Sequence, residues 1–167
     1  MTSSRPVAPP VERATPPPSS RAVNRLLCWV LASPRRSGPL GGSLLVLHLV
    51  GRTSGRPFSF PVAYRPADDG RLLVLTSSPW RVNLRGRPDV EVTLRGRRYP
   101  AVAELVEDLD EVAAVYRQLL EEVGVEHATR RLGLRVAVDG VPTRAELADA
   151  VRRDHLALVY LHVLRPG

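Results

Sequence analysis

Short apolar runs separated by glycine- and proline-containing turns are the sequence feature that most constrains the fold of this chain. Six such runs occur, at residues 43–50, 57–65, 71–76, 89–94, 98–107 and 155–163. The connecting segments at residues 51–56, 66–70 and 95–97 are short enough to join antiparallel neighbours. The pattern therefore predicts a mainly β fold with flanking helices, in which a six-stranded antiparallel sheet forms a small barrel rather than a sandwich.

Three helices are predicted around this sheet. The first spans residues 22–33 and ends before Pro34, a second spans residues 109–123, and a third begins at the capping box Thr143–Glu146 and runs to Arg153. The first helix carries one apolar stripe, formed by Val23, Leu26, Leu27, Val30 and Leu31. Trp29, Arg35 and Arg36 would suit a membrane interface, but such a stripe more often packs on its own domain, and we favour core packing.

Composition indicates one domain preceded by a tail. The first 20 residues are rich in Pro, Ser and Thr and are predicted to be disordered, and residues 21–167 are predicted to form a single domain. Cys28 is the single cysteine, which excludes an internal disulfide and a CxxC motif. The apolar runs are far too short to span a bilayer, and the first 20 residues lack the pattern of a secretory signal. The expected location is therefore cytoplasmic, and peripheral contact with a membrane is the alternative.

The positive charge of the chain is concentrated in its first two thirds. The net charge is +7, and all 24 basic residues are arginines. Residues 51–98 contain ten arginines against four acids, whereas residues 99–167 contain eight against twelve. A basic stretch inside a folded domain can concentrate a small anionic ligand. Aromatic residues make up only 5% of the chain, so the stacking platforms of a nucleic-acid binder are lacking.

The turn between the first two apolar runs is the main candidate for an anion site. It consists of Gly51, Arg52, Thr53, Ser54, Gly55 and Arg56. Backbone N–H groups freed by the two glycines, the two hydroxyls and the two guanidinium groups could together hold a phosphate. A soluble hairpin turn needs glycine but does not need this combination of side chains, and it remains the alternative.

The order of several motifs resembles the deazaflavin (F420)-dependent nitroreductase family, which belongs to the split β-barrel flavin and deazaflavin oxidoreductases. The motifs are "VNRLLCWVLASP", "GRTSGRP", "PVAY" and "PWRVNLRGRPDVEV". The resemblance covers about residues 23–163. It implies a six-stranded split β-barrel and coenzyme F420, a deazaflavin, with FMN as the alternative cofactor. The loop before Trp80 is shorter than in many members, and Thr53 stands where Lys or Arg is common.

The resemblance also implies where the coenzyme binds. The glycine turn would hold the phosphate and oligoglutamate tail, Ser77 and Ser78 would lie near the polar edge of the ring, Trp80 would form an apolar wall, and Asn83 would hold the loop. Trp80 could equally anchor the core, and Asn83 could simply cap a turn. His48 and His162 lie in apolar runs and are expected to be core histidines with hydrogen-bond partners. No metal-ligand spacing is visible, and no catalytic residue is identified.

The motifs and the family resemblance support two alternative functions. In the first, the protein is an oxidoreductase that passes a hydride from the reduced deazaflavin to a small electron-poor acceptor such as a quinone, a nitro compound or an activated alkene. In the second, the same barrel is a non-catalytic module that binds a flavin or an apolar ligand, potentially at a membrane. A homodimer is compatible with either function, and nucleic acid is not an expected partner.

Overall fold

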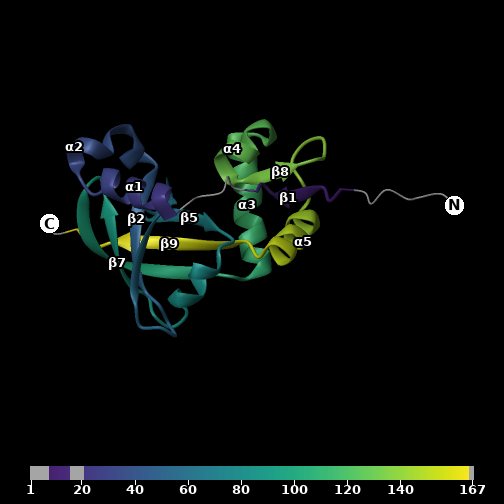
Figure 1. The fold of residues 1–167 in the computed structure, drawn as a ribbon. Helices are drawn as coiled ribbons and strands as arrows, with labels where there is room; N and C mark the ends of the chain where they lie inside the picture. The colour runs from purple at the N-terminus through teal and green to yellow at the C-terminus, as the bar shows by residue number, and fades with distance from the viewer. Residues whose placement is uncertain (1–7, 16–20, 166–167) are drawn as a thin grey trace. The chain divides into compact units, whose positions relative to one another are not determined.

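The computed structural model describes residues 8–15 and 21–165, which fall into two compact units (Figure 1). Residues 21–106 and 157–165 form one unit, called here the barrel unit. Residues 8–15 and 107–156 form the other, called here the helical unit. The single domain expected for residues 21–167 stays a prediction.

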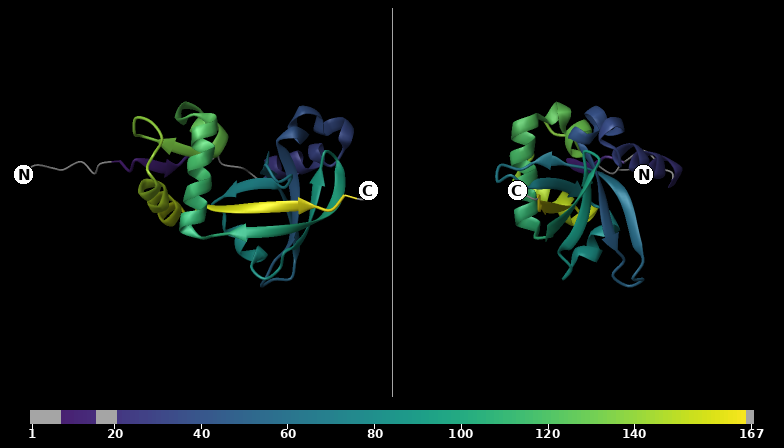
Figure 2. Two further views of the ribbon diagram at one scale, coloured as in Figure 1. Left: turned by 180° about the vertical axis from the view of Figure 1, so that it is seen from behind. Right: turned by 90° about the vertical axis from the view of Figure 1, so that its left-hand side faces the viewer.

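The barrel unit is built on one antiparallel sheet that curls on itself (Figure 2). Its strand order is β3-β2-β6-β7-β9-β5-β4. The strands are β2 (Leu44–Val50), β3 (Pro57–Ala63), β4 (Arg65–Pro66), β5 (Leu72–Thr76), β6 (Asp89–Leu94), β7 (Arg97–Val106) and β9 (Ala157–Val163). All six predicted strands are present, and the prediction of an antiparallel split-barrel fold is confirmed. The seventh strand, β4, arises because the run predicted at residues 57–65 is interrupted at Tyr64.

Strand alternation separates the sheet into an inner and an outer face. Leu45, Leu47 and Leu49 of β2 are almost fully buried and belong to the main apolar core. The residues between them point the other way, and the register pairs His48 with Ser59 of β3 on one side and with Glu91 of β6 on the other. Because successive side chains of a strand alternate between faces, these polar residues gather on the outer face of the sheet.

The hairpin between β6 and β7 has a two-residue turn, which packs against the chain at Ser33 and Pro34. Leu94 pairs with Arg97, so only Arg95 and Gly96 form the turn, and both have positive φ angles, 49° and 77°. Positive φ at both central residues is the conformation that suits the right-handed twist of a hairpin. A Cβ atom on Gly96 would lie 2.1 Å from the backbone nitrogen of Pro34. Glycine is therefore required here both by conformation and by space.

The opening helices of the barrel unit are α1 (Arg21–Leu31), α2 (Pro34–Ser37) and the 3-10 helix η1 (Gly38–Gly42). The predicted helix is confirmed, but it ends at Leu31, two residues before the predicted end at residue 33, and Pro34 begins α2. Core packing of its stripe is only partly correct, because Leu31 is buried whereas Val23 and Leu26 are exposed. Within residues 8–15 and 21–165, no helix is long and apolar enough to cross a membrane.

The helical unit contains α3 (Leu109–Val123), η3 (Val125–His127), α4 (Ala128–Leu132) and α5 (Arg144–Asp154). The bounds of α3 match the prediction, and the predicted capping box of α5 is formed by Thr143 and Glu146. The same unit holds a small sheet of β1 (Val11–Arg13) and β8 (Leu134–Val136).

The predicted disordered tail is wrong for residues 8–15, because β1 lies within them. Val11 is buried, and the Arg13 backbone N–H donates to the Asp154 carboxylate at 2.8 Å. A strand of three residues needs little apolar surface of its own when an existing strand offers unpaired backbone groups. The rest of the predicted tail, residues 1–7 and 16–20, lies outside the described residues.

Candidate functional site

The turn at residues 51–56 joins β2 to β3 and is closed by its own backbone. The Gly51 N–H donates to the Arg56 carbonyl at 2.9 Å, and the Gly55 N–H donates to the Gly51 carbonyl at 2.9 Å. Gly55 has a φ of 64°, and a Cβ atom on Gly51 would lie 2.3 Å from Ser54 Oγ. Both glycines are thus explained by the turn itself. Their own N–H groups already donate within the turn, so any N–H groups that bind a phosphate belong to other residues of the turn.

Other groups of the turn stay available to an anion. The guanidinium groups of Arg52 and Arg56 are exposed and have no ion-pair partner among residues 8–15 and 21–165. Within the same residues, the backbone N–H groups of Thr53 and Ser54 have no hydrogen-bond acceptor. Ser54 Oγ accepts a hydrogen bond of 3.3 Å from the Arg56 N–H. Two charged forks and two adjacent N–H donors form a suitable donor set for a phosphate or carboxylate.

Asn83 connects this turn to the second predicted motif. Its Oδ1 accepts a hydrogen bond of 2.8 Å from the Arg52 backbone N–H, and its Nδ2 donates to the Trp80 carbonyl at 2.8 Å. Asn83 lies in the 3-10 helix η2 (Pro79–Leu84), which follows β5. The predicted role of Asn83 in holding its own loop is therefore observed, and the same side chain also holds the glycine turn. Two motifs that are about thirty residues apart in sequence are in this way brought together.

Ser77, Ser78 and Trp80 occupy the segment between β5 and Asn83. Ser77 Oγ is buried without a hydrogen-bond partner among the described residues, which makes it a free polar group for a ligand atom. The Ser78 N–H donates to Thr76 Oγ1 at 3.0 Å. The Trp80 ring is half-buried against the core, with its centroid 5.1 Å from that of Phe60. Core anchoring is thus a definite role of Trp80, and its contact with a coenzyme ring remains a prediction.

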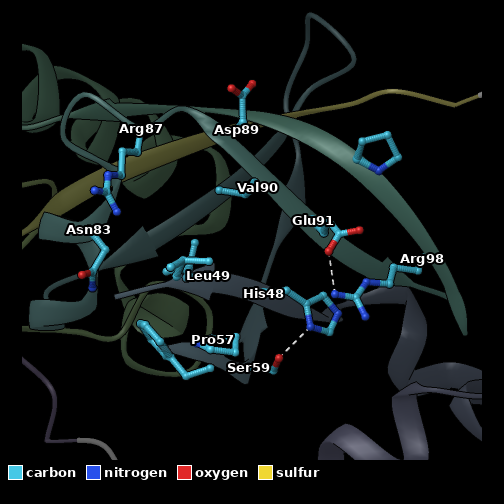
Figure 3. A pocket seen from close by; sticks show the side chains of 13 residues that line it. His48, Leu49, Pro57, Ser59, Asn83, Arg87, Asp89, Val90, Glu91 and Arg98 are labelled. Atoms are coloured by element: carbon cyan, nitrogen blue, oxygen red, sulfur yellow. Dashed lines mark hydrogen bonds and ion pairs between the residues drawn. The ribbon is translucent and has the colours of Figure 1, made fainter. Parts of the chain in front are cut away.

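A cleft of about 400 Å³ begins beside the turn (Figure 3). Val50, which precedes Gly51, and Pro57, which follows Arg56, both line it. In Figure 3, Asn83 and Arg87 lie on one side of the cleft, and His48 and Arg98 lie on the other. The remaining lining residues are Leu49, Phe58, Ser59, Asp89, Val90, Glu91 and Pro100. Of the ten residues predicted to bind the coenzyme, Asn83 is the one that lines this cleft.

His48 is the central polar group of the cleft. Its Nδ1 lies 2.7 Å from Ser59 Oγ, and its Nε2 lies 2.8 Å from Thr93 Oγ1, so both ring nitrogens are bonded to hydroxyls. Nearby, Arg98 forms an ion pair of 2.6 Å with Glu91. Burial lowers the pKa of His48 below its ordinary value, the Arg98 charge lowers it further, and Glu91 opposes both. The imidazole is therefore neutral at neutral pH.

The two histidines expected in the core have different environments. His48 is half-buried and has hydrogen-bond partners, as expected, but it also faces the cleft. His162 is exposed, so its expected burial is wrong. An apolar run does not tell which of its residues point outward, because alternation places every second side chain on the outer face.

The lowered pKa of His48 predicts a pH-dependent contribution to stability. In the unfolded chain the imidazole binds a proton near pH 6.5, whereas the folded protein binds it only at lower pH. This contribution is therefore fully present above pH 6.5 and decreases as the pH falls from there toward the folded-state pKa. Urea unfolding at about pH 7.5 and about pH 5.5 should show a larger loss for the wild type than for His48→Gln. His162→Gln, at the exposed histidine, is the control and should behave as wild type. Equal losses in wild type and His48→Gln would contradict the prediction.

The chain is similar to several solved structures at low sequence identity. No curated protein matches the sequence significantly. Among solved structures, the chain is similar to a pyridoxamine 5'-phosphate oxidase-related, FMN-binding protein from Nostoc punctiforme, with 14% identity over 87% of this chain and 82% of that one and a TM-score of 0.47. It is also similar to an FAD-binding protein from Mesorhizobium loti, with 16% identity over 84% and 89% and a TM-score of 0.44.

A family model gives the decisive match. The model of the F420H(2)-dependent quinone reductases aligns with residues 34–139, which is more than half of the chain. The matched segment contains the glycine turn, Asn83 and all the residues that line the cleft. The chain belongs to the F420H(2)-dependent quinone reductase family, a family of oxidoreductases.

Proposed function

We propose that this protein is a reductase that binds reduced coenzyme F420 and reduces a quinone. The observation that carries the proposal is that the turn, with its exposed guanidinium groups and two available N–H groups, lies directly beside the cleft. Val50 and Pro57 flank the turn in sequence and line the cleft in space. A ligand with an anionic chain at one end and a flat ring at the other matches this combination.

The donor set of the turn fits the anionic part of the coenzyme. F420 carries a phosphate and an oligoglutamate tail. Arg52 and Arg56 offer such anions two guanidinium groups that have no ion-pair partner in the part of the chain that the structure describes. The N–H groups of Thr53 and Ser54 add two neutral donors. Charge-assisted hydrogen bonds of this kind are about twice as strong as neutral ones. The turn would thus fix one end of the coenzyme.

The cleft offers a place for the ring of the coenzyme. Leu49, Val50, Pro57 and Phe58 give it apolar surface, and His48 and Arg87 present polar groups from opposite sides. An apolar cleft with a few convergent polar groups is the usual form of a cofactor site. Ser77, Ser78 and Trp80 define an alternative position for the ring, since Trp80 packs on Phe60, which points to the opposite face of β3 from Ser59.

Bound F420H2 supplies a hydride for the acceptor, and the chain supplies binding, orientation and partial exclusion of water. A quinone is the acceptor that the family supports, and nitro compounds and activated alkenes are further electron-poor acceptors for the same chemistry. FMN remains the alternative cofactor, because it also joins a phosphate to a flat ring. A homodimer and a cytoplasmic location remain predictions.

The proposal is tested by measuring coenzyme binding and quinone reduction with the purified protein. Calorimetric titration with F420 should give saturable binding that is tighter than binding of FMN. Reduced F420 should then be oxidised by a water-soluble quinone only when the protein is present. If both coenzymes fail to bind, the proposal is wrong and the chain is instead a non-catalytic barrel module.

A pair of bulky substitutions distinguishes the two ring positions. Val50→Trp would fill the cleft beside the turn, whereas Val102→Trp places the same side chain on an exposed β7 position outside its lining. A ring in the cleft predicts that Val50→Trp weakens F420 binding about tenfold or more and that Val102→Trp does not. Unchanged binding in Val50→Trp, together with loss of binding in Ser77→Val, would instead favour the Trp80 side.

A further inference from the structure

His48 lies between two hydroxyl groups that differ in burial. Its Nδ1 lies 2.7 Å from Ser59 Oγ, and its Nε2 lies 2.8 Å from Thr93 Oγ1. Ser59 is exposed and lines the cleft, whereas Thr93 is only 8% exposed and is not among the lining residues. The three side chains come from the neighbouring strands β3, β2 and β6. They form a chain of two hydrogen bonds, and Figure 3 shows the one between His48 and Ser59, at the cleft.

The burial of Thr93 decides the direction of these hydrogen bonds. A hydroxyl group has one hydrogen to donate, and a buried hydroxyl that donates to nothing costs free energy. In the part of the chain that the structure describes, His48 Nε2 is the only hydrogen-bond partner of Thr93 Oγ1. Thr93 therefore donates to Nε2, which must be the unprotonated nitrogen of the ring.

The neutral imidazole of His48 then carries its single hydrogen on Nδ1. Burial lowers the pKa of His48, which keeps the ring neutral at neutral pH. The Nδ1–H donates to Ser59 Oγ, so this bond does not use the hydroxyl hydrogen of Ser59, and no other described residue accepts that hydrogen. In the opposite tautomer, Ser59 would donate to Nδ1 and the buried hydroxyl of Thr93 would have no acceptor. The Ser59 hydroxyl is therefore available as a donor to the cleft.

We propose that Ser59 is a directed hydrogen-bond donor of the cleft, which Thr93 orients through His48, and that it selects ligands with a ring carbonyl oxygen. A carbonyl oxygen is a pure acceptor and suits a hydroxyl that is fixed as a donor. The side chains of Val50 and Phe58 in the same cleft supply apolar surface for the ring that carries the carbonyl. Ser59 is thus a specificity-determining residue that touches the ligand, and His48 and Thr93 are positioning residues.

Two ligands of the proposed function carry such an oxygen, and this part of the inference rests on that function. The deazaflavin ring of F420 and a quinone both have ring carbonyl groups. A hydrogen bond to either one would orient a ring that takes part in hydride transfer. The direction of the hydrogen bonds at His48, by contrast, depends on neither the coenzyme nor the acceptor.

The tautomer of His48 tests the first half of the proposal without any ligand. Long-range proton–nitrogen NMR spectra of the nitrogen-labelled full chain distinguish protonated from unprotonated ring nitrogens, and His48→Gln assigns the signals among the four histidines. Wild-type His48 should be protonated at Nδ1 and not at Nε2 at neutral pH. Thr93→Val removes the hydroxyl that fixes this state and should populate both tautomers, whereas Thr93→Ser should retain the wild-type tautomer. An Nε2–H tautomer in the wild type, or an unchanged tautomer in folded Thr93→Val, would overturn the proposal.

Binding measurements test the second half. Ser59→Ala removes the donor and should weaken ligand binding about three- to tenfold, the effect of one neutral hydrogen bond, whereas Ser59→Thr keeps the hydroxyl and should restore binding. Ser43→Ala removes an exposed serine hydroxyl outside the cleft lining and is the matched control. Calorimetric titration gives the Kd of F420, and assays with reduced F420 give the KM of menadione, a quinone. A loss in the Kd alone assigns the carbonyl to the coenzyme ring, and a loss in the KM alone assigns it to the quinone.

Equal binding by Ser59→Ala and Ser43→Ala for both ligands would overturn the proposal. FMN and menadione alone are titrated as well, because each has ring carbonyls and neither titration needs F420. If the wild type binds one of these but not F420, the proposed function fails, and the loss expected in Ser59→Ala still tests the inference. If the wild type binds none of the three, the assignment of Ser59 to a ring carbonyl is wrong.

Discussion

Replacing Gly96 with alanine is expected to destabilise the barrel unit by about 3 to 5 kcal/mol, the largest effect of any single substitution considered for the fold. Two causes add. An alanine at a φ of 77° is strained by about 1 to 2 kcal/mol. Its Cβ would also lie 2.1 Å from the backbone nitrogen of Pro34 and 2.3 Å from the carbonyl carbon of Ser33, so backbone must move. Urea unfolding of the purified variant measures the loss.

Gly70→Ala provides a control that separates the two causes. Gly70 also has a positive φ, 82°, but a Cβ atom there would meet nothing within 4 Å. This variant should therefore show the conformational strain without the clash, a loss of about 1 to 2 kcal/mol. An equal loss in both variants would mean that the turn at residues 95–96 moves away from Pro34 easily, and the tight packing inferred there would be wrong.

The strands of the barrel could be predicted from sequence because their signals are local. Each apolar run is bounded by a turn containing Gly or Pro, and β2 and β6 agree with the predicted runs to within a residue. The helix starts are equally local, since Thr143 and Glu146 lie within one turn of each other. β1 and β8 were missed because each has three residues and too little pattern of its own, and their pairing joins positions about 120 residues apart.

The candidate site was predicted only where its residues are close in sequence. The glycine turn and the segment Ser77–Asn83 each form a visible motif, but the hydrogen bond that joins them depends on the folded path of the chain. The cleft was missed for a related reason. His48, Ser59 and Glu91 come from three strands, and they meet only after the register has been set. The one available signal was a polar residue within an apolar run, and His48 was such a residue.

The exposed half of the α1 stripe was also not predictable from spacing. Helical periodicity identifies an apolar stripe but does not give the width of the surface that receives it. The barrel unit covers Leu31 and leaves Leu26 largely exposed. The apolar stripe of α1 is wider than the part of the barrel unit that covers it. This difference becomes visible only when the burial of each residue is known.

Arg52→Ala and Arg56→Ala are each expected to weaken F420 binding by about 1.5 to 3 kcal/mol, which is about tenfold or more in Kd. This is the largest effect expected on function, since each change removes a charged group from the turn that is proposed to hold the anionic part of the coenzyme. Thermal stability should be unchanged, because both side chains are exposed and have no ion-pair partner among the described residues. Calorimetric titration of each variant with F420 measures the effect, and added salt should weaken wild-type binding as well.

Arg97→Ala is the matched control for these two variants. It removes the same charge from an exposed strand position outside the turn, so it should lower the affinity only by the small change in the overall field. The Arg52 variant is especially informative, because the backbone N–H of residue 52, and not the side chain, donates to Asn83. Alanine therefore preserves the link between the two motifs and removes only the guanidinium group. If Arg52→Ala and Arg56→Ala bind F420 as tightly as Arg97→Ala does, the arginines of the turn serve solubility, and the coenzyme must find its anion site elsewhere.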